Sequence, residues 1–301
     1  MNGSIDHISI CICTYRRAEL LRNLLDKLHD QKTEGLFSYS IVVVDNDQDG
    51  SARNIAAGFQ KNSSVITLDY DIEPQKSIPM ARNRAVQNAR GNFIAFIDDD
   101  EFPVDGWLLN LYKTCIKCNA DAVLGPVRPH FETRPPGWIV KGKFFDRPEY
   151  KTGTILRWEE TRGGNVLLKK YMFHDPSDSF DPSYLHGEDK ELFRRMMEKG
   201  RIFVWCNEAP AFETQLPCRF KRMYFLKRAL VRGNFSFRHE SSKLLTMQKS
   251  LIALVAYTVL LPFLLFIRHD LFMKYLIKDC DHVGKLMAGC GIYIQDLQNQ
   301  L

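Results

Sequence analysis

The sequence lacks several features that would assign it to a common class of protein. It contains no internal repeat and no low-complexity segment, which argues against a repeat protein or a disordered chain. Residues 1–10 contain no basic stretch followed by an apolar run, so we expect no secretion signal. No G-x-G-x-x-G follows the first apolar run, which argues against a Rossmann dehydrogenase.

The eight cysteines form no recognisable pairing pattern. Several lie inside apolar runs, such as "ICIC" at 10–13 and "VWC" at 204–206, which is typical of reduced core residues in a cytosolic protein. Cys115 and Cys118 form a C-x-x-C, but without a second pair or a nearby histidine this spacing is weak evidence for zinc. We therefore expect reduced cysteines and no zinc site.

The apolar residues that are present suffice for a large core. The chain has 301 residues, of which 45% are hydrophobic, and this fits one large α/β domain with an appendage or two smaller domains. The net charge of +5 is modest, but basic residues crowd into residues 219–238 beside an apolar run. Such a surface suits phosphate or anionic lipid, and we expect no nucleic-acid partner.

Short apolar runs alternate with helical patterns along the first hundred residues. Runs typical of strands lie at 7–15, 39–47, 64–70 and 92–97, and helical patterns lie at 16–31, 51–61 and 78–90. The less regular second half suggests helices at 104–117 and 187–200, strands at 121–125, 165–169 and 201–206, and a loop at 130–138. Alternating helices and uninterrupted apolar strands predict a mostly parallel sheet that is covered on both faces.

The strand predicted at 92–97 runs directly into four acidic residues, "DDDE" at 98–101. Ligands of parallel sheets bind at the carboxyl ends of the strands, where these acids lie. Side chains alternate along an extended chain, so Asp98 and Asp100 would point one way and Asp99 the other. Such an oxygen-only D-x-D pair favours Mg²⁺ or Mn²⁺. The alternative, capping of the next helix, fits one acid better than four.

Five segments in a fixed order resemble those of the family 2 glycosyltransferases, inverting enzymes of GT-A fold that use nucleotide-diphosphate sugars. The segments are "ISICICTYRR", "IVVVDNDQDGSA", "ARNRAVQNARGNFIAFIDDDEFP", "GGNVLLKK" and "GEDKELFRRM". The resemblance implies an α/β fold of GT-A (Rossmann-like) type, with a mixed, mostly parallel sheet flanked by helices. We expect this domain at residues 1–240 and a C-terminal, apolar and helical membrane-associating region at 241–301.

The resemblance also implies roles for individual side chains. Contacts with the nucleotide sugar are expected from Thr14, Tyr15, Arg16, Asp45, Arg82, Asp98, Asp99, Asn165, Arg228 and Arg232. Asp100, with Asp98, would hold the divalent cation, Mn²⁺ or Mg²⁺, that bridges the diphosphate. Asp189, with Glu188 beside it, would be the catalytic base that takes the proton of the acceptor hydroxyl. A carboxylate at Asp45 suits the imide N–H of uracil, which favours a UDP-sugar donor.

Most of these side chains have a structural alternative. Asp45 begins "DNDQDG", a strong turn sequence. Glu188 and Asp189 would also favour the N-terminus of their own helix through its dipole. Asn165 ends "RGGN", which either approaches a sugar closely or forms a turn before the next strand. Arg82 could instead be a charged surface residue with a structural role only.

An uncharged apolar run at 251–267 lies between Lys249 and Arg268 and contains Pro262. Its length is at the short limit for a membrane span, so a short span, an in-plane or re-entrant segment and a buried core helix are all open. The basic, aromatic-rich flank at 219–239 favours an anionic membrane surface, and its arginines would contact either lipid or the diphosphate. We expect peripheral or monotopic attachment on the cytoplasmic side of the inner membrane.

The sequence thus predicts a metal-dependent inverting glycosyltransferase that acts on a glycan or a lipid-linked oligosaccharide. One alternative is a nucleotidyltransferase, which also uses paired aspartates and a metal, although no glycine-rich triphosphate loop is evident. The other is a catalytically silent scaffold subunit that binds a nucleotide sugar. Retention of both Asp100 and Asp189 argues against the silent subunit.

Overall fold

The computed structural model describes residues 5–63, 65–184, 187–237, 240 and 242–294. The chain divides into two compact units, of which the first comprises Met1–His130 and Arg147–Thr214 and the second comprises Phe131–Asp146 and Gln215–Leu301. Compactness defines these units, and the functional division expected at residue 240 stays a prediction.

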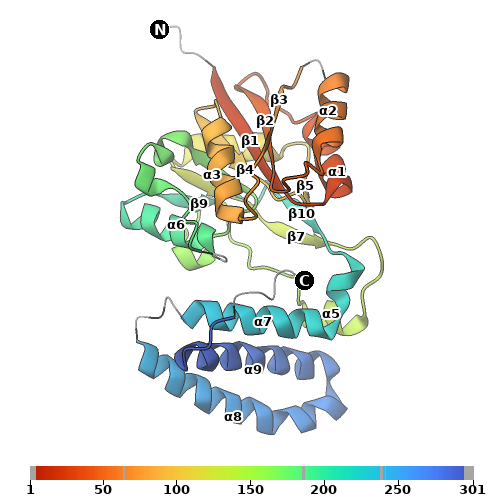
Figure 1. Cartoon of the computed structure of the whole chain (residues 1–301), viewed down its shortest axis with the longest axis vertical. Coiled ribbons are helices and arrows are strands. Elements are labelled where there is room, and N and C mark those ends of the chain that lie inside the picture. Colours follow the sequence, from red (N-terminus) through yellow and green to blue (C-terminus); the bar gives the residue numbers. More distant parts are fainter. Residues whose placement is uncertain (1–4, 64, 185–186, 238–239, 241, 295–301) are drawn as a thin grey trace. The chain divides into compact units, whose positions relative to one another are not determined.

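A seven-stranded sheet forms the centre of the first unit (Figure 1). Its order is β3 (Leu68–Ile72), β2 (Phe37–Asp45), β1 (Asp6–Thr14), β4 (Phe93–Phe96), β8 (Val166–Lys169), β6 (Ala122–Leu124) and β9 (Phe203–Trp205). Strand β1 pairs in parallel with β2 and β4, whereas β8 is antiparallel to both of its neighbours. The prediction of a mixed, mostly parallel sheet is confirmed.

Helices cover both faces of this sheet, because alternate residues of each strand face opposite sides. Ile8, Ile10 and Ile12 of β1 share a core with α1 (Ala18–Leu28), α2 (Arg53–Asn62) and α4 (Trp107–Lys117). Cys11 of β1 faces the other core, with α3 (Ile78–Asn88) and α6 (Glu188–Glu198). The leucines with helical period in α1, at 21, 24, 25 and 28, are all buried.

A second, three-stranded sheet has the order β5 (Glu101–Pro103), β10 (Ala211–Thr214), β7 (Val127–His130). Strand β5 begins at the last residue of the acidic run. The N–H of Glu101 donates to the carbonyl of Asp98 at 3.0 Å, so the three aspartates form a turn between β4 and β5. Short 3₁₀ turns lie at Trp158–Glu160, Lys170–Phe173 and Pro176–Asp178.

The second unit is helical. It contains α5 (Gly137–Gly142), α7 (Arg222–Ser236), α8 (Lys243–Ile267) and α9 (His269–Gly289), with a 3₁₀ turn at Pro217–Phe220. The apolar run predicted from the sequence lies in α8, which continues through Pro262. By length and composition α8 is a candidate membrane span, and only 6% of its most apolar window is buried. The alternative of a buried core helix is therefore wrong for the described chain.

Candidate active site

The acidic turn is fixed against the end of β1. Asp99 accepts hydrogen bonds from Thr14 Oγ1 at 2.8 Å and from Arg17 Nη1 at 2.9 Å. The same guanidinium nitrogen lies 3.3 Å from Asp100 Oδ2. The expectation that Asp99 points away from Asp100 is therefore wrong, because the aspartates form a turn and not an extended strand. Thr14 and Asp99 are both buried, so this pair joins β1 to the turn. Contact of either residue with a nucleotide sugar stays a prediction.

Like charges crowd this turn. Side-chain exposure is 48% for Asp98 but only 7% for Asp100. Burial raises the pKa of Glu101 well above its usual range, and Asp98 adds to the shift while Arg147 opposes it. The pKa of Asp98 is also raised, by partial loss of surrounding water and by the nearby Asp100 and Glu213, although about half of its side chain is exposed and Arg82 opposes the shift. The turn therefore concentrates carboxylates that a cation would stabilise.

The donor set fits a hard divalent cation. A Cβ built on Gly164 would lie 2.8 Å from Glu101 Oε1 and 2.9 Å from Asp98 Oδ2, so these two oxygens converge beside the glycine. Oxygen donors of this kind suit Mg²⁺ or Mn²⁺, which bind through one or two carboxylates and complete their shell with water and phosphate. The described residues contain no group of three His, Cys, Asp or Glu side chains placed to hold a metal ion.

Arg82 of α3 connects the acidic turn to the start of α6. Its Nη1 lies 2.9 Å from Glu188 Oε1 and its Nη2 lies 3.4 Å from Asp98 Oδ1. The guanidinium also lies over the rings of Phe96 and Phe180, at 6.0 and 5.6 Å from their centres. With only 10% of its side chain exposed, Arg82 is rigidly held between two carboxylates.

Two glycines complete the site on the side of Asp189. The N–H of Gly163 donates to Asp189 Oδ2 at 2.5 Å, and Oδ1 of the same carboxylate accepts from the N–H of Lys190 at 2.7 Å. A Cβ on Gly163 would lie only 2.3 Å from Arg82 Nη1. The turn Gly163–Gly164 thus lies against Asp189 at its first residue and against the acidic turn at its second.

Glu188 is buried next to Arg82, and this burial raises its pKa to about 7 from 4.5, although Arg82 opposes the shift. Between these pH values the folded protein holds a proton that the unfolded chain has released, so this group's contribution to stability falls as pH rises. We expect Glu188→Gln to gain thermal stability relative to wild type as pH increases from about 5 to 7.5.

Thermal melts of both proteins across this pH range test the expectation. Glu198→Gln, at the exposed end of α6, is the matched control and should follow the wild-type pH profile. Parallel profiles for Glu188→Gln and wild type would contradict the raised pKa.

Asp45 lies at the end of β2 and is fully buried. Its oxygens accept from the N–H groups of Ala52 and Asp47 and from the hydroxyls of Tyr70 and Ser51. This is the turn chemistry named as the alternative. Contact with a base stays a prediction, and it would require one of these hydroxyls to be displaced.

Asn165 is also fully buried, with a left-handed φ of 52°. Its Oδ1 accepts from Trp107 Nε1 at 2.6 Å, and its Nδ2 donates to the carbonyls of Pro126 and Ala209 at 2.8 and 2.9 Å. The side chain therefore anchors the glycine turn to three other segments. A contact with sugar, which stays a prediction, would cost these hydrogen bonds.

Tyr15 and Arg16 lie just beyond β1. Arg16 is 59% exposed and pairs with Asp47 at 3.0 Å. The centre of the Tyr15 ring lies 4.6 Å from Lys76 Nζ and 5.3 Å from the Arg16 guanidinium carbon. A partly exposed ring beside cations suits a base and its phosphates, which agrees with the predicted nucleotide contacts without testing them.

Arg228 and Arg232 lie on α7 in the second unit. Arg228 donates to the hydroxyl of Tyr224 at 3.0 Å, and Arg232 pairs with Asp281 of α9 at 2.7 Å. Their contact with a diphosphate stays a prediction.

Several charged residues near the acidic turn received no individual role from the motifs. Glu101 ends the turn, Arg17 pairs with Asp99 in it, and Arg147 pairs with Glu213 beside it. Arg162, which precedes the glycine turn, has its pKa lowered to about 10 by burial, and among the described residues its Nη1 has no hydrogen-bond partner. Its position next to "GGN" was the available signal.

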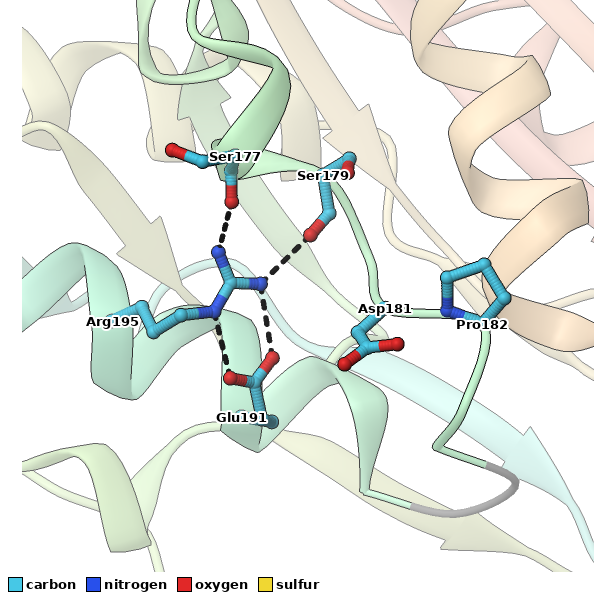
Figure 2. Close-up of a pocket in the computed structure, with 6 residues that line it drawn as sticks. All are labelled: Ser177, Ser179, Asp181, Pro182, Glu191 and Arg195. Atoms are coloured by element: carbon cyan, nitrogen blue, oxygen red, sulfur yellow. Dashed lines mark hydrogen bonds and ion pairs between the residues drawn. The ribbon is translucent and has the colours of Figure 1, made fainter.

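A surface pocket lies beside α6, toward its C-terminal end (Figure 2). It is lined by Ser177, Ser179, Asp181, Pro182, Glu191 and Arg195. Arg195 pairs with Glu191 at 2.7 Å and donates to the carbonyls of Ser177 and Ser179, as Figure 2 shows. These bonds satisfy its guanidinium, and none of the predicted site residues lines the pocket, so we assign it no part in the chemistry.

Comparison with known proteins identifies the family. Residues 9–176 match glycosyl transferase family 2. The chain belongs to this family. It is 38% identical over 232 residues to the succinoglycan biosynthesis protein ExoM of Rhizobium meliloti (strain 1021), covering 75% of this chain and 73% of that protein. It is 26% identical over 250 residues to the chondroitin synthase of Escherichia coli, covering 71% of this chain but only 35% of that synthase.

Solved structures share the fold of this glycosyltransferase. TarS 1–349 of S. aureus in complex with UDP aligns with a TM-score of 0.54 at 17% identity, covering 96% of this chain and 93% of that one. GalNAc-T7 with UDP, GalNAc and Mn²⁺ aligns with a TM-score of 0.52 at 12% identity, covering 71% and 45%. The predicted family, the GT-A fold and the enzyme class are confirmed, and the relatives include proteins of polysaccharide biosynthesis.

Proposed function

We propose that this family 2 glycosyltransferase moves a sugar, with inversion, from a UDP-sugar to a hydroxyl of a growing glycan or lipid-linked oligosaccharide. The observation that carries the proposal is the Gly163–Gly164 turn. Gly163 donates to Asp189, and Gly164 lies against the oxygens of Asp98 and Glu101. A candidate base and a candidate cation site are therefore separated by two residues without side chains.

Asp189 acts as the base in this proposal. As an acceptor hydroxyl attacks the anomeric carbon, one carboxylate oxygen of Asp189 takes its proton and the bond from that carbon to the diphosphate breaks. The side chain is partly exposed, so an acceptor can reach it, and the N–H groups of Gly163 and Lys190 fix its orientation. Attack from the side opposite the departing nucleoside diphosphate inverts the configuration.

In this proposal Asp98 and Asp100 would hold Mn²⁺ or Mg²⁺, with Glu101 beside Asp98 as a further oxygen donor. When bound, such a cation neutralises the charge that develops on the departing diphosphate. Arg82 keeps Asp98 and Glu188 in place, since it pairs with both. The fold neighbours that contain UDP, and in one case Mn²⁺, support a UDP donor and a divalent cation.

Family membership favours glycosyl transfer over the nucleotidyltransferase and over the silent scaffold. Relatives named for succinoglycan biosynthesis and for chondroitin synthesis support a glycan or lipid-linked acceptor. The exposed apolar helix α8 supports attachment to a membrane, which we place at the cytoplasmic side of the inner membrane.

Calorimetric titration of UDP with and without Mn²⁺, on wild type and Asp100→Asn, tests the donor site. We expect binding that needs the cation and weakens at least about tenfold in the variant, because one ligand and one negative charge are lost. Asp30→Asn, whose side chain is 89% exposed, is the matched control and should bind UDP as wild type does. If wild type binds UDP equally well with and without Mn²⁺, or if Asp100→Asn binds UDP with Mn²⁺ as tightly as wild type does, the acidic turn is not part of the donor site.

A further inference from the structure

Helices α8 and α9 form an antiparallel hairpin within the second unit. Only Arg268 separates the last residue of α8 from the first of α9. The Met247 side chain lies beside Gly289, and hydrogen bonds join Ser250 to His282 and Thr258 to Asp279. Residues later in α8 contact residues earlier in α9, so the two helices lie antiparallel and in contact along their length. Within this unit Figure 1 shows α9 between α7 and α8.

The charges of α9 prevent this hairpin from crossing a bilayer. The 25 residues of α8 are long enough to span, since a helix rises about 1.5 Å per residue and the hydrocarbon core is about 30 Å thick. However, Asp279 of α9 bonds to Thr258 in the second half of α8, and α9 also carries Lys274, Lys278, Asp281 and Lys285. If α8 spanned while paired with α9, these charges would enter the hydrocarbon, where such residues are rare and costly.

The side of α8 that does not contact α9 is wholly apolar over residues 251–267. Ile252, Val259 and Phe266 recur every seven residues on one side of the helix and are 71, 65 and 88% exposed. Further exposed apolar side chains are Leu251, Val255, Leu260, Phe263, Leu265 and Ile267. A continuous apolar helix face of this length is unusual in water and fits the acyl region of a lipid layer.

The boundary between the two helices has the composition of a membrane interface. Lys278 Nζ of α9 lies 5.5 Å from the ring centre of Tyr257 in α8 and 5.2 Å from that of Tyr275. Tyrosine and lysine are the side chains that occupy the level of lipid headgroups. Lys274 and Lys278 are exposed one turn apart on α9, so they can meet anionic headgroups.

We propose that α8 lies in the plane of the membrane, with its exposed face among the acyl chains and α9 at the level of the headgroups. The occupant of the apolar face is thus a lipid layer with anionic headgroups. The inference rests on the membrane attachment proposed above, and it selects the in-plane arrangement over the span.

Depth measurements distinguish these arrangements. Three variants each carry one new cysteine, at Ile252, Val259 or Phe266, in a Cys218→Ser, Cys290→Ser background. A nitroxide is attached to this cysteine. Its depth in the membrane is measured from its spin relaxation by oxygen and by a polar nickel complex. The full chain is bound to phosphatidylcholine vesicles with about a quarter phosphatidylglycerol, an anionic share chosen to attract the lysines. In-plane binding predicts three similar depths of about 5–10 Å. In a span the outer two labels would be separated by about 21 Å along the helix.

Each outcome decides a different claim. Three depths that change progressively along α8 would overturn the in-plane arrangement and leave membrane attachment intact. Three labels in water would overturn the attachment itself, together with this inference. Glycosyl transfer to a soluble acceptor is measured separately on the same variants, so a failure of the enzymatic proposal cannot be mistaken for either result.

Charge removal provides a second test on α9. The double variant Lys274→Gln, Lys278→Gln should bind anionic vesicles about 25-fold more weakly, because each lysine near an anionic surface contributes about fivefold to the affinity. Its binding to neutral vesicles should stay unchanged. Lys61→Gln with Lys117→Gln, at exposed lysines of the first unit, is the matched control. Equal weakening by both pairs would overturn the position of α9 at the headgroups.

Discussion

Asp189→Asn is expected to reduce transfer by about 10²–10⁴-fold while donor binding stays close to that of wild type, which is the contribution typical of a general base. The amide has the shape of the carboxylate, and its oxygen still accepts the N–H of Gly163, so the glycine turn keeps its place. The amide cannot take a proton from the acceptor hydroxyl. The loss should therefore appear in kcat rather than in the affinity for UDP.

Steady-state transfer and calorimetric UDP binding, measured on the same preparation, test this expectation. Glu198→Gln is the matched control, since it removes a carboxylate from the exposed end of the same helix. Unchanged transfer in Asp189→Asn would remove this residue from the mechanism. Equal losses of transfer and UDP binding would instead mean that Asp189 acts by holding the glycine turn.

The seven-stranded sheet of the first unit and its helices can be predicted from local sequence patterns, whereas the three-stranded sheet cannot. Strands β1, β2 and β4 are long or strongly apolar, and the helices between them repeat leucine or alanine at helical period, so each element is recognisable alone. The strands β5, β7 and β10 have three or four residues each and exist because distant segments pair, as Phe212 does with Phe102 and Arg128. Such pairing leaves no periodic signal in any one segment.

The site shows the same distinction between what motifs contain and what packing decides. The acidic turn and the start of α6 were both expected, but only the fold places Gly163 and Gly164 between them. Asp45 and Asn165 show the reverse case. Their side chains satisfy buried backbone and side-chain groups, and a sequence motif cannot distinguish this role from a contact with ligand.

In the second unit, the orientation of α8 relative to a membrane could not be predicted from the sequence, for a different reason. The sequence shows that residues 251–267 are apolar enough for a membrane, but it does not show which helix accompanies them. The charges of α9 constrain α8 only because Asp279 and Lys278 pack against Thr258 and Tyr257. Orientation relative to a membrane is therefore a property of the helix pair and not of the apolar run alone.

Gly163→Ala is expected to reduce kcat/KM by about 100-fold or more without unfolding the protein, because misplacement of a catalytic group by about 1 Å can cost that much. The new Cβ would lie 2.3 Å from Arg82 Nη1 and 2.8 Å from its Cζ. Arg82 cannot easily move aside, since Glu188 and Asp98 hold its guanidinium. Gly163 has no left-handed φ, so the effect comes from this clash and not from backbone strain.

Two comparisons separate the clash from a general loss of stability. Gly58→Ala in α2, where a Cβ meets no atom within 4 Å, should keep full activity and gain about 0.5–1 kcal/mol of stability. If the clash with Arg82 is the cause, Gly163→Ala should add little to Arg82→Ala, because the colliding group is already absent. Independent, additive losses in kcat/KM would show that Gly163 acts by another route, most directly through its N–H to Asp189.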